Sequence, residues 1–430
     1  MSMSASPGRI RVIVLLAVLA VVGAGCSSSS GGGAHAVLTF NAFEPYSGSE
    51  AVFGPENQTG CLAAVAVINQ GGGILGHHVQ CTSTDSRSDA ADAVPAAQQM
   101  IASTQNLVGV VGPSTNEAPS TVSLFNKQHI PMIAQTGDPA FDRTHYSYFY
   151  RPTPGDDVNG YAMALWARKQ LGFSRAATVF GNDVAGQGVV PNLVKGFTKL
   201  GGTVVINEKL VLDQSSYRTE IERLVAANPQ VIFTELDPQT AATFFGELKQ
   251  LHGLYPVVGD GGTIGYSAWV QAVERAIGAA NMGKYYAGVQ IINPSGGEAW
   301  NVYKAALLKA PVKNPSQYLR DPYTQTDYDG VIEMALAMWE SKSTNPAVFN
   351  RYILKVVSPS SGAVIVHTYA EGVRAIKAGH TIQYVGSAGP TIYNQFHNAT
   401  MPWEADTVSS SLQVIRKGVV PAGSVAALDG

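Results

Sequence analysis

The residues of this chain that could bind a small molecule follow predicted buried strands. The segment LVGVVGPSTNEAPST, residues 107–121, passes from an apolar run through Gly-Pro to polar residues. The apolar half is too short to span a membrane and lacks helical spacing, so it predicts a buried strand, a tight turn and a helix. Ser114 and Thr115 in the turn would add hydroxyl donors to the free N–H groups of the helix N-terminus, which suits an anion. Either residue could instead simply cap the helix.

Two acidic residues end other predicted strands. Glu235 lies in FTELDP, residues 233–238, and Asp260 lies in VVGDGG, residues 257–262. An ammonium group that is removed from water needs a carboxylate partner, so either acid could bind a ligand amine. Each acid could equally be a helix cap or a turn residue.

Motifs for catalysis and for cofactor binding are missing from the sequence. It has no G-x-S-x-G elbow, no H-E-x-x-H and no P-loop lysine, and GDGGTIG lacks the spacing of a dinucleotide motif. Its nine histidines show no metal-ligand spacing, and a net charge of −3 with 14% charged residues gives no basic field for nucleic acid. We therefore expect a binding protein and not an enzyme, without a cofactor, a metal or a nucleic-acid partner.

The first residues have the layout of a secretory signal. Arg9 and Arg11 precede the apolar run VIVLLAVLAVV, residues 12–22, and GAGC ends at Cys26. Because this run is short for a membrane helix, it favours export. Cys26 resembles the cysteine of a bacterial lipobox, which is diacylated and becomes the mature N-terminus, although Gly23 stands where Leu or Val is usual. The alternative is an ordinary cleavage site with an incidental cysteine.

The residues after Cys26 predict a tether to a membrane. We expect a signal peptide over residues 1–26 and a flexible Ser/Gly tether over residues 27–35, with the folded body lipid-anchored at the extracytoplasmic face of a bacterial cell membrane. Such a compartment permits disulfides, and Cys61 and Cys81 are an even pair without zinc-site spacing. We therefore expect a disulfide between them.

From residue 36 onward, strand-like segments alternate with helix-like segments, as in a mostly parallel sheet covered by helices. The alternation starts again at RAATVFGN, residues 175–182, after the Pro/Gly-rich stretch YRPTPGDD, residues 150–157. This stretch has no periodicity and predicts a crossing between domains. A chain of 430 residues is long enough for two domains, so the pattern predicts two α/β lobes.

The body resembles the receptors of branched-chain amino acid ABC transporters, the Leu/Ile/Val-binding family with the type I periplasmic-binding fold. The resemblance rests on motifs that occur in order, among them PYSGSEAVFGPENQTG, NQGGGILG, VGVVGPST, IPMIAQTGDP, YRPTPGDD, VFGNDVAGQG, LVAANPQVIF and IQYVGSAG. It implies two Rossmann-like lobes joined by three crossovers, with a ligand cleft between them that closes by hinge motion. The implied lobes are residues 36–152 plus 285–382 and residues 153–284 plus 390–430.

The resemblance also implies which residues contact the ligand. The segment 112–116, with Ser114 and Thr115, matches the part of the family that binds an α-carboxylate, and Gln135 or Thr136 after the next strand would complete this clamp, with Thr136 preferred. Phe53 falls where relatives have an aromatic wall, unless it only packs at a helix start. Asp260 is the preferred partner of a ligand amine, and Glu235 is the alternative.

One departure from the family concerns the ligand. Ala185 in VAGQG stands where relatives often have Tyr, so the identity of the solute stays open. We expect a receptor that captures an amino acid or a related small polar solute and delivers it to an ABC permease. A ligand-sensing receptor that signals to a membrane partner is the alternative.

Overall fold

The computed structural model describes residue 1 and residues 36–291 and 295–429. The chain divides into an N-terminal unit, residues 1–34, and a compact unit from His35 onward. The predicted signal peptide, Cys26 and the predicted tether lie outside the described residues. Within the part that the structure describes, no helix is both long and apolar enough to cross a membrane.

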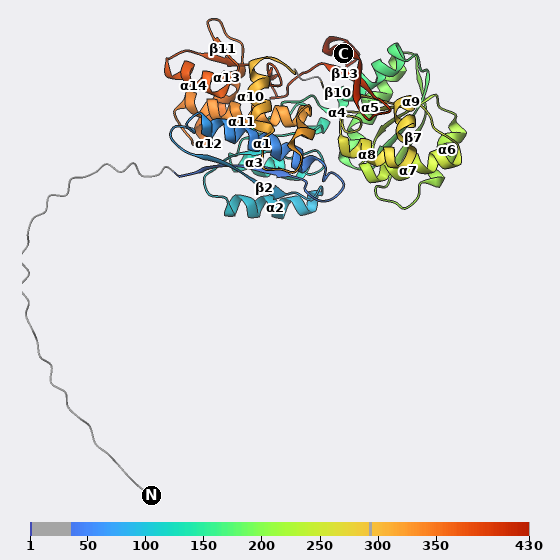
Figure 1. The fold of residues 1–430 in the computed structure, drawn as a ribbon, viewed down its shortest axis with the longest axis horizontal. Helices are drawn as coiled ribbons and strands as arrows, with labels where there is room; N and C mark the ends of the chain where they lie inside the picture. The colour runs from blue at the N-terminus through green and yellow to red at the C-terminus, as the bar shows by residue number, and fades with distance from the viewer. Residues whose placement is uncertain (2–35, 292–294, 430) are drawn as a thin grey trace, which may run out of the picture. The chain divides into compact units, whose positions relative to one another are not determined.

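The first lobe is built on a five-stranded parallel sheet with helices on both faces (Figure 1). The strands lie in the order β2 (Val79–Asp85), β1 (Leu38–Glu44), β3 (Leu107–Val111), β4 (Met132–Ile133) and β5 (Phe149–Tyr150). All seven residues of β1 are buried. Phe40 and Ala42 contact one hydrophobic core and Phe43 contacts the other, as expected for a strand covered on both faces.

Two sets of helices cover the first sheet. One core packs against α2 (Ala90–Ser103) and α3 (Ala118–Lys127). The other packs against α1 (Phe53–Gln70), α10 (Gly297–Leu307), α11 (Pro322–Ser341), α12 (Pro346–Phe349), α13 (Ile353–Val357) and α14 (Tyr369–Lys377). A small parallel pair, β11 (Val364–Val366) and β12 (Ile382–Tyr384), lies beside these helices.

The second lobe is built on a seven-stranded sheet. Its order is β14 (Val414–Val420), β13 (Trp403–Val408), β10 (Tyr286–Ile291), β9 (Val257–Gly259), β8 (Val231–Glu235), β6 (Arg175–Gly181) and β7 (Thr203–Leu210). The strands from β10 to β7 are parallel, whereas β13 pairs antiparallel with both β10 and β14.

The two faces of the second sheet also have separate cores. One contains residues of α4 (Asp156–Leu165), α5 (Val184–Lys199) and α15 (Ala422–Asp429). The other contains residues of α6 (Arg218–Ala227), α7 (Pro238–Leu251), α8 (Ser267–Ile277) and α9 (Ala279–Tyr285). The predicted class of two α/β lobes is therefore confirmed.

The structure corrects one predicted boundary. We expected the chain to return to the first lobe at residue 285, but β10 (Tyr286–Ile291) pairs with β9 and β13 of the second sheet. The return therefore comes after Ile291. Sequence patterns missed it because YAGVQII has the apolar character of any buried strand, and only its pairing decides which sheet it joins.

A disulfide joins Cys61 on α1 to Cys81 on β2, as expected, with a Cα–Cα distance of 6.1 Å. Cys61 is fully buried in the core beneath α1. The bond therefore ties a core helix to the outermost strand of the first sheet.

Candidate ligand-binding cleft

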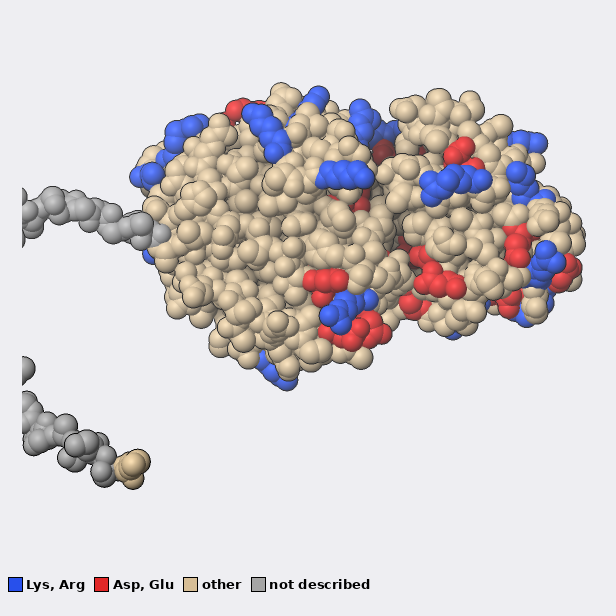
Figure 2. Space-filling model, turned by 60° about the horizontal axis from the view of Figure 1, so that its bottom comes forward, with Lys and Arg blue, Asp and Glu red and all other residues tan. Residues whose placement is uncertain are grey.

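A cavity of about 520 Å³, counted to its open mouth, takes lining residues from both lobes. The lining residues are Glu50, Phe53, Glu56, Asn57, Ser114, Thr115, Gln135, Gly137, Asp156, Ala185, Glu235, Asp260, Gly262, Tyr266 and Tyr323. Figure 2 shows acidic side chains recessed along the groove of the face that it draws.

Most of the predicted contact residues meet in this cavity. Six of them line it: Phe53, Ser114, Thr115, Gln135, Glu235 and Asp260. Thr136 does not, because its side chain is fully buried and its hydroxyl accepts a hydrogen bond from the Asp138 N–H at 3.2 Å. The neighbouring Gly137 lines the cavity instead.

The loop that begins at Ser114 is held by carboxylates of its own lobe. The Ser114 hydroxyl donates to Glu44, and the Ser114 N–H donates to Oε1 of Glu117 at 3.3 Å. Helix α3 begins only at Ala118, and Ser114 is not its N-cap. The alternative interpretation, that Ser114 merely caps this helix, is therefore wrong.

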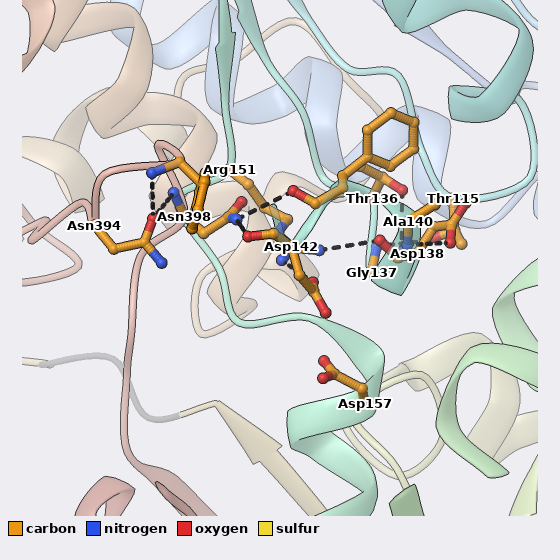
Figure 3. Close-up of polar contacts among 12 residues, drawn as sticks. Thr115, Thr136, Gly137, Asp138, Ala140, Asp142, Arg151, Asp157, Asn394 and Asn398 are labelled. Carbon is orange, nitrogen blue, oxygen red and sulfur yellow. Dashed lines mark hydrogen bonds and ion pairs between the residues drawn. The ribbon is translucent and has the colours of Figure 1, made fainter. Parts of the chain in front are cut away.

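Thr115 and Gln135 fix the next part of the wall. The Thr115 hydroxyl accepts from the Gly137 N–H at 2.9 Å (Figure 3). Gln135 donates to Oδ1 of Asp327 at 2.6 Å, and its amide oxygen accepts from the Thr153 hydroxyl at 3.2 Å. Both side chains are thus held in place by hydrogen bonds within the protein.

Three carboxylates form the wall of the second lobe. Asp260 follows β9, Glu235 ends β8 and Asp156 begins α4. Oδ1 of Asp260 accepts from the Gly262 N–H at 2.9 Å. Burial raises the pKa of Asp260 to about 7, and burial together with the charges of Asp260 and Asp156 raises the pKa of Glu235. These carboxylates lie close enough to disfavour one another's ionisation.

Two further acids, which the sequence patterns did not single out, come from the first lobe. Glu50 precedes α1 and Glu56 lies in its first turn. Burial raises the pKa of both carboxyls. Both belong to the motif PYSGSEAVFGPENQTG, but nothing in that motif reveals that these acids face the carboxylates of the other lobe.

An aromatic group joins the lobes. The ring of Phe53 from α1 meets the ring of Tyr266 edge to face, with centroids 5.1 Å apart. Tyr266 in turn stacks on Tyr323 at 6.3 Å. The predicted aromatic wall at Phe53 therefore extends to two tyrosines from distant parts of the chain, which no local pattern could have indicated.

Polar contacts join the first crossover between the lobes, at Arg151, to the last crossover, at Asn398 (Figure 3). Arg151, whose side chain is buried, forms an ion pair with Asp142 at 2.5 Å. Its backbone N–H donates to the carbonyl of His397 at 2.9 Å, and Asn398 donates to the carbonyl of Asp142 at 2.8 Å. These contacts tie the segment after β5 to the segment that leads into β13.

Asn116 of the first lobe bridges to the start of α5 in the second lobe. Its amide oxygen accepts from the N–H groups of Val184 and Ala185 at 3.1 and 3.3 Å, and its amide nitrogen donates to Asp183 at 3.1 Å. These hydrogen bonds exist only when the lobes touch, so Asn116 stabilises the closed arrangement.

Replacing Asn116 by Ala is expected to weaken solute binding about tenfold. The closed state loses two or three hydrogen bonds, each with a net value of about 0.5–1.5 kcal/mol, and water recovers part of that loss. Asn116→Asp should weaken it further, since a carboxylate would face Asp183. Calorimetric titration measures both affinities. Equal affinities for wild type and both variants would contradict the role of this bridge.

The unliganded protein is expected to lose stability as the pH rises from about 5 to about 8. Burial holds the pKa of Asp260 and of Glu117 at about 7, above the ordinary values of 3.8 and 4.5, so the folded state binds more protons than the unfolded state in this window. The loss should reach at least about 1 kcal/mol, or about 2–4 °C in Tm. Thermal unfolding at several pH values measures it, and Asp260→Asn should flatten the profile. A Tm that rises toward pH 8 would contradict the prediction.

The two α/β lobes are joined by crossovers and share a polar cleft, which is the arrangement of a site for a small molecule. The family model described as periplasmic binding protein matches residues 41–351, so the chain belongs to that family. Periplasmic binding proteins serve ABC transporters and work outside the cytoplasm.

Named relatives agree with this family. The Leu/Ile/Val-binding protein BraC3 of Rhizobium johnstonii is 23% identical over 57% of this chain and 67% of its own length. Matches to curated relatives span between about half and two thirds of those relatives' lengths.

Solved structures show the same fold. The LivJ substrate-binding protein of Streptococcus pneumoniae, in complex with isoleucine, aligns with a TM-score of 0.70 at 17% identity and covers 90% of this chain and 99% of its own. A solute-binding protein from R. palustris, in complex with benzoate, aligns with a TM-score of 0.69 at 17% identity and covers 90% of this chain and 97% of its own.

Proposed function

We propose that this protein captures an amino acid or a related small polar solute in the cleft and delivers it to the permease of an ABC transporter. The observation that carries the proposal is the cavity, which takes polar and aromatic side chains from both lobes. A solute that contacts both lobes favours their closed arrangement, which a permease can then recognise. The names of the relatives mention Leu/Ile/Val, isoleucine and benzoate as the molecules bound. These names support a small solute for this protein and leave its identity open.

The contact residues that we propose are those predicted residues that line the cavity: Phe53, Ser114, Thr115, Gln135, Glu235 and Asp260. Glu50, Tyr266 and Tyr323 join them because they line the same cavity. Thr136 is left out, since its side chain is fully buried and does not line the cavity.

A thermal-shift screen of the purified protein against amino acids, amides, amines and small carboxylates tests the proposal. A solute that binds only the folded state should add about 2.7 kcal/mol at 100 times its Kd, which is easily seen as a raised midpoint. Uptake of the solute that is found should then depend on the receptor in cells. Binding without receptor-dependent uptake would favour the sensing role, and stoichiometric binding of no small solute would contradict the proposal.

We also propose that Cys26 carries the lipid that anchors the protein to the membrane. Cys26→Ser is expected to shift the protein from the membrane fraction to the soluble fraction of its host, because one acylated residue supplies the anchor. Immunoblots of the two fractions measure this, with Cys61→Ser as a control that leaves the anchor in place. An unchanged membrane fraction for Cys26→Ser would exclude a lipid on this residue.

A further inference from the structure

The lining of the cleft is acidic from both lobes. Among the described residues, no Lys or Arg lines the cavity, whereas five carboxylates do. They are Glu50, Glu56, Asp156, Glu235 and Asp260. The adjoining cavity, which shares Glu50 and Glu235, adds Asp183 and Asp237 and again has no basic residue in its described lining. A bound anion would therefore find no basic partner in the described lining of either cavity.

Buried acceptors in this lining lack donors. Glu50 is 6% exposed and Asn57 is 1% exposed, yet Oε2 of Glu50 and Oδ1 of Asn57 have no hydrogen-bond partner within the described part of the chain. Glu235 has such an oxygen as well. Buried acceptors are normally paired, so these atoms call for donors from a ligand. An ammonium group brings three donors and a guanidinium group five, and neither brings an acceptor.

The loop that was expected to bind a ligand carboxylate already holds carboxylates of the protein. Glu44 accepts from the Ser114 hydroxyl, and Glu117 accepts from the Ser114 N–H. A ligand carboxylate would have to displace these acids and then lie beside them. The geometry of the loop therefore disfavours an anionic group on the solute.

Aromatic rings complete the lining. Phe53, Tyr266 and Tyr323 form one connected group of rings in the cavity, and ring faces attract organic cations. Metal ions fit less well: the structure, in the residues that it describes, has no group of three or more His, Cys, Asp or Glu side chains placed to hold one.

We infer that the solute is an organic cation, a molecule with amine or guanidine nitrogens and no carboxylate or other anionic group, held between the acids of the two lobes and the three rings. The inference rests on the proposed solute-binding function and narrows its substrate class. It assigns to Glu50 a direct contact with the cationic nitrogen, together with the carboxylates of the second lobe.

Titration of the purified protein with defined probes tests this inference. The probes are 1,4-diaminobutane, spermidine, agmatine, L-leucine, benzoate and magnesium chloride, each followed by calorimetry and thermal shift. At least one of the three amines is expected to bind with a Kd at least 100-fold lower than L-leucine or benzoate, and magnesium is expected not to compete with it. Tighter binding of L-leucine or benzoate than of every amine would overturn the inference and leave the proposed function standing. Binding of no probe would overturn the inference, and the wider thermal-shift screen would then decide whether the proposed function stands. Tight magnesium binding at the site would replace the organic cation by a metal.

A matched pair of variants tests the contact residue. Glu50→Gln is expected to lower the affinity for the bound amine at least tenfold, whereas Glu298→Gln, at an exposed residue of α10, should leave it unchanged. If circular dichroism shows that Glu50→Gln does not fold, Glu56→Gln tests the same acidic wall of the first lobe instead. Unchanged amine affinity in a folded variant of this wall would overturn the inference.

Discussion

Replacing Glu235 by Gln and Asp260 by Asn together is expected to lower the affinity for the cationic solute by at least about 100-fold. Both acids line the cavity, and a cation beside them would favour the ionised form of each carboxyl. Removing one partner of a desolvated charged pair costs about 2–5 kcal/mol. A 100-fold loss of affinity lies in the lower part of that range. The isosteric amides keep the shape of the wall and remove only its charge.

The same double variant is expected to be more stable than wild type without ligand. Burial penalises the charged form of both acids, so their removal relieves a cost that only the solute offsets. Calorimetric titration and thermal unfolding, with Glu298→Gln as the control, measure the two effects.

The single variants decide which acid pairs with the amine. If Asp260→Asn leaves the affinity within about twofold of wild type while Glu235→Gln abolishes binding, Glu235 is the partner; the reverse result selects Asp260. Unchanged affinity in the double variant would contradict the role of this wall.

Replacing Asp329 by Ala is expected to destabilise the protein by about 3–5 kcal/mol. Asp329 lies on α11 and is 1% exposed. Its carboxylate accepts from the Tyr384 hydroxyl at 2.8 Å and from the N–H groups of Ser387 and Ala388 at 3.0 and 2.6 Å. Alanine would leave these donors buried and unpaired, and each such group costs about 1–3 kcal/mol.

These contacts hold the start of the last crossover. A Cβ at Gly386 would lie 2.2 Å from Oδ1 of Asp329, so the glycine of VGSAG lets the backbone approach the carboxylate. Without Asp329, the segment after β12 should therefore loosen together with the global loss of stability.

Urea unfolding measures the effect of Asp329→Ala, with two graded controls. Tyr384→Phe removes a single hydrogen bond and should cost about 1 kcal/mol. Asp329→Asn keeps one acceptor and should fall between the two. A loss below about 1 kcal/mol for Asp329→Ala would show that this carboxylate does not hold the crossover.

The amino-acid sequence by itself determined the class of fold and much of the site. The apolar run LVGVV predicted a strand of the first sheet because both faces of a parallel strand are buried. Ser114, Thr115, Glu235 and Asp260 follow or end such strands, and parallel strands bring these ends to one edge of a sheet. The pairing of Cys61 with Cys81 followed from their number and the predicted compartment.

The tertiary structure alone decided which sheet each later strand joins. Strand β10 belongs to the second lobe, and β13 and β14 add an antiparallel edge to it. The reason is physical: the pairing of β10 with β13 joins residues more than a hundred positions apart, whereas a run of apolar residues looks alike in either sheet.

The tertiary structure also decided the charge of the cleft. Glu50 and Asp156 are unremarkable as sequence, and only folding buries them beside Glu235 and Asp260. Likewise, Ser114 looked like a donor to an anion until the fold brought Glu44 and Glu117 to its hydroxyl and N–H groups. Local patterns report which groups a segment offers, but burial and neighbouring charges, which set the sign of the site, arise from contacts between distant segments.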